Sequence, residues 1–177
     1  MIERYTRERM GRLFTDQAKM EAWLRVEIAV SEVLAERGEI PEEALHDIKR
    51  HAAVDVERAK EIEKTVNHDV IAFVTAAAEK VGESGRYLHL GLTSSDVLDT
   101  SLSLVMQEAF VILLEEMDAF LTVLREQAER WAEQPMVGRT HGVNAEPTTF
   151  GFKIAGWYAE MRRHRQRLER AREQAAF

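Results

Sequence analysis

The sequence predicts an all-α protein, with a small helical N-terminal domain followed by the long helices of an elongated helical bundle. Apolar residues recur at intervals of three or four along most of the chain, as in helices with one buried face. The 177 residues include only 9 glycines and 3 prolines, and neither type occurs between Asp96 and Trp131. The one strand-like run, 87–90, is too short to build a sheet.

The first half of the chain contains signals for three helical segments. Residues 1–14 are mixed in character and are interpreted as an arm on the surface. A helix is predicted to begin after Thr15, a good N-cap residue, and to end where Gly38 can supply the C-cap. Pro41 favours the first turn of a second helix. A further helical pattern runs over 55–81.

The longest helix is predicted to follow a cluster of hydroxyl groups. Thr93, Ser94 and Ser95 are all suited to an N-cap, and Asp96 can complete a capping box with Thr93. A helix N-terminus also presents unpaired backbone N–H groups and the positive end of the helix dipole. The same hydroxyl groups could therefore cap the helix, hold a carboxylate or phosphate, or do both.

The second half of the chain is predicted to contain two long helices joined by a loop over 136–146. Pro147 is expected to open the last helix, which starts at Thr148. The first long helix would measure about 55 Å at ~1.5 Å per residue, so it needs partner helices along its length. We infer a domain over 1–92 and an incomplete bundle over 93–177, completed by other chains or by further sequence.

Composition narrows the classes of protein. Hydrophobic residues make up 45% and charged residues 31%, which is typical of an ordered soluble protein. No run approaches the ~18 apolar residues of a membrane-spanning helix, and no signal-peptide pattern is present, so a cytoplasmic setting is expected. The absence of cysteine excludes disulfides and thiol catalysis. A net charge of −7 argues against general nucleic-acid binding.

Six histidines fall into two groups. Three lie among charged residues on helices and are expected on the surface: His46, His51 and His164. The other three lie beside chain breaks or small polar residues: His68, His89 and His141. Because histidine titrates near neutrality, each of these is a candidate general acid or base. Taken singly, each is also compatible with a purely structural role.

Other kinds of site find little support. The three candidate histidines lack the close pair of a metalloprotease motif, so a metal site is not expected. The chain has neither a strained serine elbow nor a glycine-rich phosphate loop. We therefore expect acid–base chemistry on an anionic small molecule, without a cofactor.

Four separated segments carry a family resemblance. They are Gly138–Gly151 (GRTHGVNAEPTTFG), Leu90–Val97 (LGLTSSDV), Met1–Tyr5 (MIERY) and Asn67–Val70 (NHDV). These segments, in the order in which they occur along the chain, resemble those of the adenylosuccinate lyases of the fumarase/aspartase superfamily, whose fold is L-aspartase-like. The resemblance covers nearly the whole chain and implies that it corresponds to the N-terminal portion of such an enzyme.

The resemblance implies β-elimination of fumarate from two succinylated purine nucleotides. Adenylosuccinate would give AMP, and the succinylated carboxamide ribotide SAICAR would give AICAR. His141 would be the general acid that protonates the departing nitrogen, with His68 beside it. Substrate-binding roles would fall to Arg4 and Tyr5 at the phosphate, Thr93, Ser94 and Thr140 at a succinyl carboxylate, and Asn67, Asp69 and His89 nearby.

The same resemblance implies a further catalytic segment that these 177 residues do not contain. The family's general base is a serine on a glycine-rich loop with lysine and asparagine, and no such segment occurs here. The chain alone is therefore expected to be inactive, and the whole enzyme is expected to be a homotetramer. Two alternatives stay open: another fumarate-releasing lyase of the superfamily, and a non-catalytic helical oligomerisation scaffold.

Overall fold

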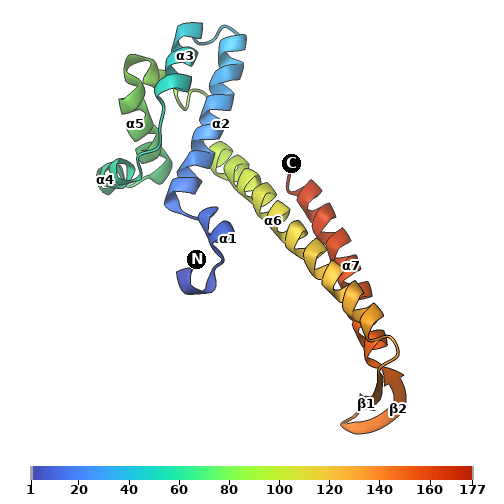
Figure 1. Cartoon of the computed structure of the whole chain (residues 1–177). Helices are drawn as coiled ribbons and strands as arrows, with labels where there is room; N and C mark the ends of the chain where they lie inside the picture. The colour runs from blue at the N-terminus through green and yellow to red at the C-terminus, as the bar shows by residue number, and fades with distance from the viewer. Residues whose placement is uncertain (1, 177) are drawn as a thin grey trace. The chain divides into compact units, whose positions relative to one another are not determined.

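The computed structural model describes residues Ile2–Ala176, without the side chain of Glu3. The chain divides into two compact units, Met1–Met106 and Gln107–Phe177, and each is described by itself. Figure 1 follows the order of the elements along the chain. Within the described residues seven α-helices and one two-stranded sheet are present, so the predicted all-α class is confirmed apart from that sheet.

The first unit is built from short and medium helices. Its elements are η1 (Glu3–Tyr5), α1 (Glu8–Arg12), α2 (Asp16–Glu36), α3 (Glu42–His51), α4 (Val56–Val66), α5 (Asp69–Val81), η2 (Gly82–Tyr87) and the start of α6 (Ser94–Arg130). The expected arm before residue 15 thus contains two short helices. The strand-like run at 87–90 forms no strand, since Tyr87 ends η2 and the following residues form a turn.

The ends of α2 are set by the two residues that the sequence indicated. The Thr15 hydroxyl accepts the Ala18 N–H at 3.1 Å, which satisfies one of the unpaired donors of the first turn. Gly38 has a φ of 71°, and its N–H donates to Ala35 O at 2.9 Å. The Glu39 N–H reaches Leu34 O at 2.9 Å, which completes a Schellman motif. Both predicted caps are confirmed.

The helical pattern over 55–81 proves to be two helices. Asp55 caps α4 by accepting the Arg58 N–H at 3.0 Å, as a start at this residue predicts. Asn67 then takes a left-handed conformation, with φ 52° and ψ 38°, and ends α4. His68 is extended and becomes the N-cap of α5. Periodicity missed the break because the apolar stripe continues across it, whereas asparagine is a common left-handed C-cap.

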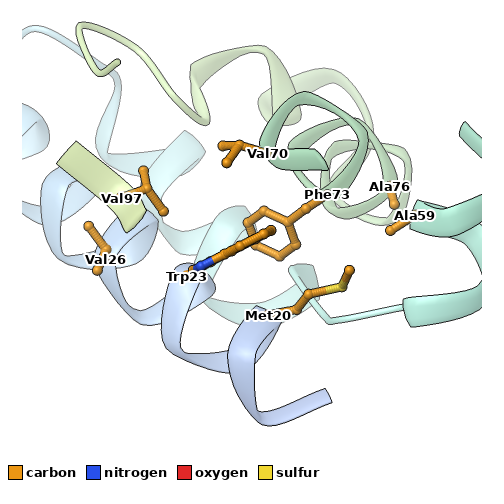
Figure 2. Packing of buried hydrophobic residues seen from close by; sticks show 8 residues of the cluster. All are labelled: Met20, Trp23, Val26, Ala59, Val70, Phe73, Ala76 and Val97. Carbon is orange, nitrogen blue, oxygen red and sulfur yellow. The ribbon is translucent and has the colours of Figure 1, made fainter. Parts of the chain in front are cut away.

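The core of the first unit gathers side chains from α2, α4, α5 and the start of α6. Trp23 and Phe73 meet edge to face, with ring centroids 5.4 Å apart and an interplanar angle of 73°, a favoured aromatic geometry. Figure 2 shows the cluster. Its buried members are Met20, Trp23, Val26, Ala59, Val70, Phe73, Ala76 and Val97. The position of Val97 on α6 fixes the N-terminal end of that helix against α2 and α5.

The second unit contains the rest of α6, a hairpin of β1 (Pro135–Thr140) and β2 (Val143–Thr149), and α7 (Phe150–Gln174). The predicted loop over 136–146 is therefore wrong, because most of it forms the two strands. The strands pair antiparallel, from Pro135 opposite Thr149 to Thr140 opposite Val143. Their connection is a two-residue turn in which both residues have positive φ, as a type I′ turn requires.

The start of the last helix also differs from the prediction. Pro147 lies within β2, opposite Val137, and α7 begins at Phe150. Thr149 is the N-cap, and its hydroxyl accepts the Phe152 N–H at 3.2 Å. Proline is tolerated in this strand because a two-stranded sheet has only edge strands. A capping threonine two residues later then outweighs proline as the start signal.

Within the second unit, α7 runs beside α6 (Figure 1). Arg165 forms two hydrogen bonds to the Asp118 carboxylate, at 2.6 and 3.2 Å. Nearer the end of the chain, Gln107 donates to Arg172 O at 2.6 Å. Both helices also expose large apolar side chains, namely Leu113, Phe120, Val123, Phe152 and Trp157. Two helices alone therefore leave apolar surface on this unit in contact with water.

By length and composition, α6 could span a lipid bilayer, and no other helix within Ile2–Ala176 meets that criterion. The sequence was expected to contain no apolar run long enough to span a membrane. That expectation holds only for uninterrupted runs, because two charged residues, Asp99 and Glu108, interrupt the apolar half of α6. The core helix of a soluble protein has the same composition, so this feature alone does not separate the two settings.

Candidate active site

Left-handed backbone conformation marks three of the residues that the sequence indicated. Among the described residues, the non-glycine positions with positive φ are Asn67 at 52°, His89 at 64° and His141 at 51°. Such conformations carry a steric cost for residues with a side chain, although asparagine and histidine tolerate them better than most. They tend to persist where the surrounding structure holds a functional group in place.

His68 and Ser94 come together at the N-termini of two helices. As the N-cap of α5, His68 accepts the Ile71 N–H through Nδ1 at 3.4 Å. Its Nε2 lies 3.3 Å from Oγ of Ser94, the first residue of α6. Since Nδ1 serves as an acceptor in this cap, the proton of neutral His68 lies on Nε2, which donates a hydrogen bond to Oγ of Ser94.

Asn67 and Asp69 flank this histidine. Oδ1 of Asp69 accepts the Val70 N–H at 2.8 Å and lies 3.7 Å from Nδ1 of His68. Asn67 is exposed, and its side-chain amide makes only a long bond, 3.4 Å, to Thr65 O. Both side chains therefore lie next to His68.

Only one half of the predicted capping box forms at the N-terminus of α6, because the carboxylate of Asp96 takes part and no bond to the Thr93 hydroxyl is observed among the described residues. Oδ2 of Asp96 accepts the Thr93 N–H at 2.8 Å, and the Asp96 N–H donates to Thr93 O at 3.0 Å. The Thr93 side chain is exposed and Ser94 is half-buried. Asp96 thus satisfies the helix end through the backbone of Thr93, which leaves the Thr93 hydroxyl available to a ligand.

His89 is held by a residue that the sequence analysis did not single out. Oε2 of Glu27 accepts the His89 backbone N–H at 2.8 Å, and Oε1 lies 2.7 Å from Nδ1 of the same histidine. Only 1% of the Glu27 side chain is exposed. The sequence does indicate that Glu27 is buried and needs a polar partner, because it lies one turn after Trp23 on the apolar face of its helix.

Arg4 and Tyr5 lie on η1 in the same unit. The Arg4 guanidinium lies 4.8 Å from the centroid of the Tyr5 ring, within the range of a cation–π contact. Tyr5 is 74% exposed. Among the described residues, neither side chain is hydrogen-bonded to His68 or Ser94. The two residues are therefore accessible, but the structure does not join them to that pair.

His141 and Thr140 belong to the second unit. His141 and Gly142 form the turn between β1 and β2, with φ of 51° and 76°. His141 and Thr140 are exposed. The turn holds the imidazole at the tip of a hairpin, where it projects from a well-defined backbone into solvent.

Two further observations concern alternatives to this site. An open pocket of about 350 Å³ lies in the first unit among apolar residues that include Trp23, Leu98 and Leu102. None of the ten sequence-predicted site residues lines that pocket, although its walls also include Asp16, Lys19 and Asp99. Within Ile2–Ala176, no group of three His, Asp or Glu side chains is arranged to hold a metal ion.

Comparison with known proteins gives the context for these residues. A family model described as "Lyase" matches residues 3–177. The chain is 52% identical over 176 residues to the adenylosuccinate lyase of Synechocystis sp., covering 99% of this chain and 41% of that protein. It is 50% identical over 177 residues to the adenylosuccinate lyase of Thermotoga maritima, again covering 41% of the relative.

Solved structures show the same fold. A fumarate lyase from Mesorhizobium sp. BNC1 has a TM-score of 0.88 at 31% identity, over 94% of this chain and 40% of that one. The 3-carboxy-cis,cis-muconate lactonizing enzyme of Pseudomonas putida has a TM-score of 0.89 at 31% identity, over 97% and 41%. The chain thus spans about 41% of the length of its curated relatives.

Proposed function

Since the chain belongs to the lyase family, we propose that it forms the N-terminal part of an adenylosuccinate lyase. The reaction is β-elimination of fumarate, from adenylosuccinate to give AMP and from SAICAR to give AICAR. The observation that carries the proposal is the identity of about 50% to curated adenylosuccinate lyases along the whole chain. The contact between His68 and Ser94 supports it by placing an imidazole at the N-terminus of α6.

The proposed chemistry removes a proton from carbon, breaks the C–N bond and protonates the departing nitrogen. His141 supplies the last proton, because a protonated imidazole can donate to the departing nitrogen as the C–N bond breaks. His68 lies beside the reacting atoms, where its Nε2–H can donate to substrate or to Ser94. Asn67 and Asp69 contact the same part of the nucleotide.

Anionic groups of the substrate are assigned to positive or N–H-rich places. A succinyl carboxylate binds at the N-terminus of α6 through Thr93 and Ser94, with Thr140 and His89 completing its surroundings. The nucleotide phosphate binds Arg4 and Tyr5, because the planar guanidinium offers paired donors to phosphate oxygens. No metal or cofactor takes part in this scheme.

The proposal also concerns what the whole enzyme needs beyond these residues. The serine-bearing glycine-rich loop expected to supply the base does not occur in the 177 residues. We therefore propose that this chain alone does not release fumarate. We further propose that the chain comprises domains over 1–92 and 93–177. The whole enzyme is proposed to be a homotetramer whose subunits cover the exposed apolar residues of α6 and α7. Its setting is proposed to be cytoplasmic, without nucleic-acid or membrane partners.

The test is substrate selectivity. A full-length protein carrying residues 1–177 is assayed for fumarate release from adenylosuccinate, SAICAR, argininosuccinate and aspartate. Release from the two succinylated purine nucleotides, at rates well above those with the other two, supports the proposal. Turnover of only argininosuccinate or aspartate would assign the chain to another fumarate-releasing lyase. The likeness to the Mesorhizobium fumarate lyase is the observation that keeps this second candidate open.

A non-catalytic scaffold is the remaining alternative. It predicts no fumarate release from any of the four substrates, together with oligomerisation through α6 and α7. The isolated chain provides a separate check, because the proposal expects it to be inactive. Turnover by the isolated 177 residues at the rate of a complete enzyme would contradict the assignment of the base to a missing loop.

A further inference from the structure

The Glu27 side chain is among the most completely buried charged groups of the first unit. It is 1% exposed, on the face of α2 that also buries Trp23 and Val26. A carboxylate in such a place is costly unless hydrogen bonds replace its water. Both oxygens have such a bond, and both bonds go to His89. The Glu27 carboxylate thus binds a single residue, His89, which lies 62 positions away in the sequence.

These two bonds fix the backbone of His89 as well as its ring. His89 has a φ of 64°, and its carbonyl oxygen accepts the Leu92 N–H at 3.3 Å. Gly91, inside that turn, also has a positive φ of 77°. The turn leads directly to Thr93 and Ser94, so Glu27 anchors the loop that enters the N-terminus of α6.

The bonds also determine where the imidazole proton lies. A backbone N–H can only donate, so Oε2 of Glu27 is an acceptor there. With the Glu27 carboxylate ionised, Oε1 can likewise only accept, so Nδ1 is the donor of this bond. Nδ1 of His89 therefore carries a proton whether the ring is neutral or charged. Nε2 is the ring nitrogen that remains, on a side chain that is 15% exposed.

We propose that Glu27 is a positioning residue for substrate binding: it holds His89 in the left-handed turn before α6, keeps the proton on Nδ1 and presents Nε2 to the ligand. The proposal rests on the function proposed above for the ligand's identity, but its proton placement is independent of that function. A carboxylate bonded only to the backbone N–H would not determine the position of the ring proton. One bonded only to the ring would not hold the backbone of the turn.

Glu27→Gln separates the tautomer from the packing. Glutamine has nearly the same shape, and its amide oxygen must face the His89 backbone N–H, because that group only donates. The amide NH₂ then faces Nδ1, which must become an acceptor. Both hydrogen bonds survive, but the proton moves to Nε2. Glu36→Gln, at the exposed last residue of α2, is the control for loss of one negative charge.

The decisive measurement is the protonation of each His89 ring nitrogen, read by ¹⁵N NMR of the 177-residue chain labelled at histidine. The His89 signals are identified by their loss in His89→Asn. We expect a protonated Nδ1 in the unchanged chain and in Glu36→Gln across neutral pH, and a protonated Nε2 with a bare Nδ1 in Glu27→Gln. A bare Nδ1 in the unchanged chain, or an unaltered tautomer in Glu27→Gln, overturns the proposal.

A second arm measures kinetics in the full-length protein with adenylosuccinate. Glu27→Gln is expected to raise KM roughly tenfold, the size of one lost hydrogen bond to a charged group, with a smaller change in kcat. Glu36→Gln should leave both constants unchanged. An unaltered KM in Glu27→Gln, with the tautomer reversed, overturns the link to substrate. If no substrate is turned over, the proposed function fails, while NMR still decides the proton placement.

Discussion

Nε2 of His68 lies 3.3 Å from Oγ of Ser94, and each residue lies at the N-terminus of a different helix. The positive ends of the α5 and α6 dipoles therefore meet at this contact. Two such ends favour an anion more than one, because the positive ends of both helix dipoles act on the same volume. This relationship makes the pair the best-supported part of the proposed carboxylate site.

Ser94→Ala tests that site directly. The variant removes one donor to the substrate carboxylate, so we expect KM for adenylosuccinate to rise roughly tenfold with the fold unchanged. Ser95→Ala is the matched control, since Ser95 is an exposed neighbour in the same helical turn. Steady-state kinetics of the full-length protein check the result. Equal kinetics in the two variants would count against a carboxylate at Ser94.

His68 combines a structural task with a proposed chemical one, and two substitutions separate them. Asparagine is a good N-cap, so His68→Asn should preserve the bond to the Ile71 N–H, whereas His68→Ala should lose about 1 kcal/mol of stability. Both variants should lose fumarate release, because neither has an imidazole. Urea unfolding measures the cap and a rate assay measures the chemistry. Activity that follows stability would assign His68 a structural role alone.

His141→Gln tests the proposed general acid. We expect the rate of fumarate release to fall by roughly 10²-fold or more in the full-length protein, because glutamine cannot deliver the proton to the departing nitrogen. His164→Gln is the control, since that histidine lies on α7 beside Glu160. A non-catalytic scaffold would be indifferent to both changes. Rates within twofold of the unchanged protein would remove His141 from the proposed mechanism.

The ion pair between Asp118 and Arg165 predicts a pH dependence of stability. The hydrogen bonds from Arg165 hold the pKa of Asp118 below its usual value of 3.8. A lowered folded pKa stabilises the protein above the unfolded pKa, and this contribution is lost as the pH falls through the folded value. Because 51% of the Asp118 side chain is exposed, the gain at neutral pH is at most about 1 kcal/mol.

Asp118→Asn should therefore destabilise the chain slightly at pH 7 and hardly at all well below pH 3.8. Denaturant unfolding of both proteins at several pH values gives the difference. A stability gap that stays constant down to the lowest pH would show that the pair contributes no pH-dependent stability. Asp99→Asn is a useful comparison, since no hydrogen bond or ion pair joins Asp99 to another side chain among the described residues.

Local sequence signals predicted most helices and their caps, because each depends on neighbouring residues. Thr15, Gly38 and Asp55 act as expected since a cap needs only its own turn. The hairpin was missed because Gly138 and Pro147 disfavour strands, and because His141–Gly142 is not the usual asparagine–glycine turn. Its formation depends on pairing across the turn rather than on either strand alone.

The candidate site likewise has parts that the sequence predicted and parts that it could not predict. The sequence pattern singled out His68, Ser94 and His141, and the resemblance assigned their roles, but their local geometry required the structure. The partner of His89 could not be predicted, because Glu27 lies on another helix and its bond depends on how α2 packs. A glutamate on an apolar helix face signals a buried partner, but nothing in the sequence says which residue that partner is.

Two glycines on α7 make the closest test of how the second unit packs. A Cβ on Gly151 would overlap Ala128 O and lie 2.6 Å from Cα of Ala132, and both obstacles are backbone atoms. A Cβ on Gly156 would meet nothing within 4 Å. Because backbone atoms at a helix contact cannot turn aside as a side chain can, Gly151→Ala must push α7 away from the end of α6.

We expect Gly151→Ala to destabilise the chain by roughly 1–3 kcal/mol, the usual cost of overpacking. Gly156→Ala should stabilise it by about 0.5–1 kcal/mol, because alanine loses less backbone entropy than glycine in a helix interior. Chemical unfolding of the two variants gives opposite signs if α7 packs as observed. If both substitutions stabilise the chain, the helix propensity of alanine dominates at each position, and Gly151 is not a close-contact point between α7 and the end of α6.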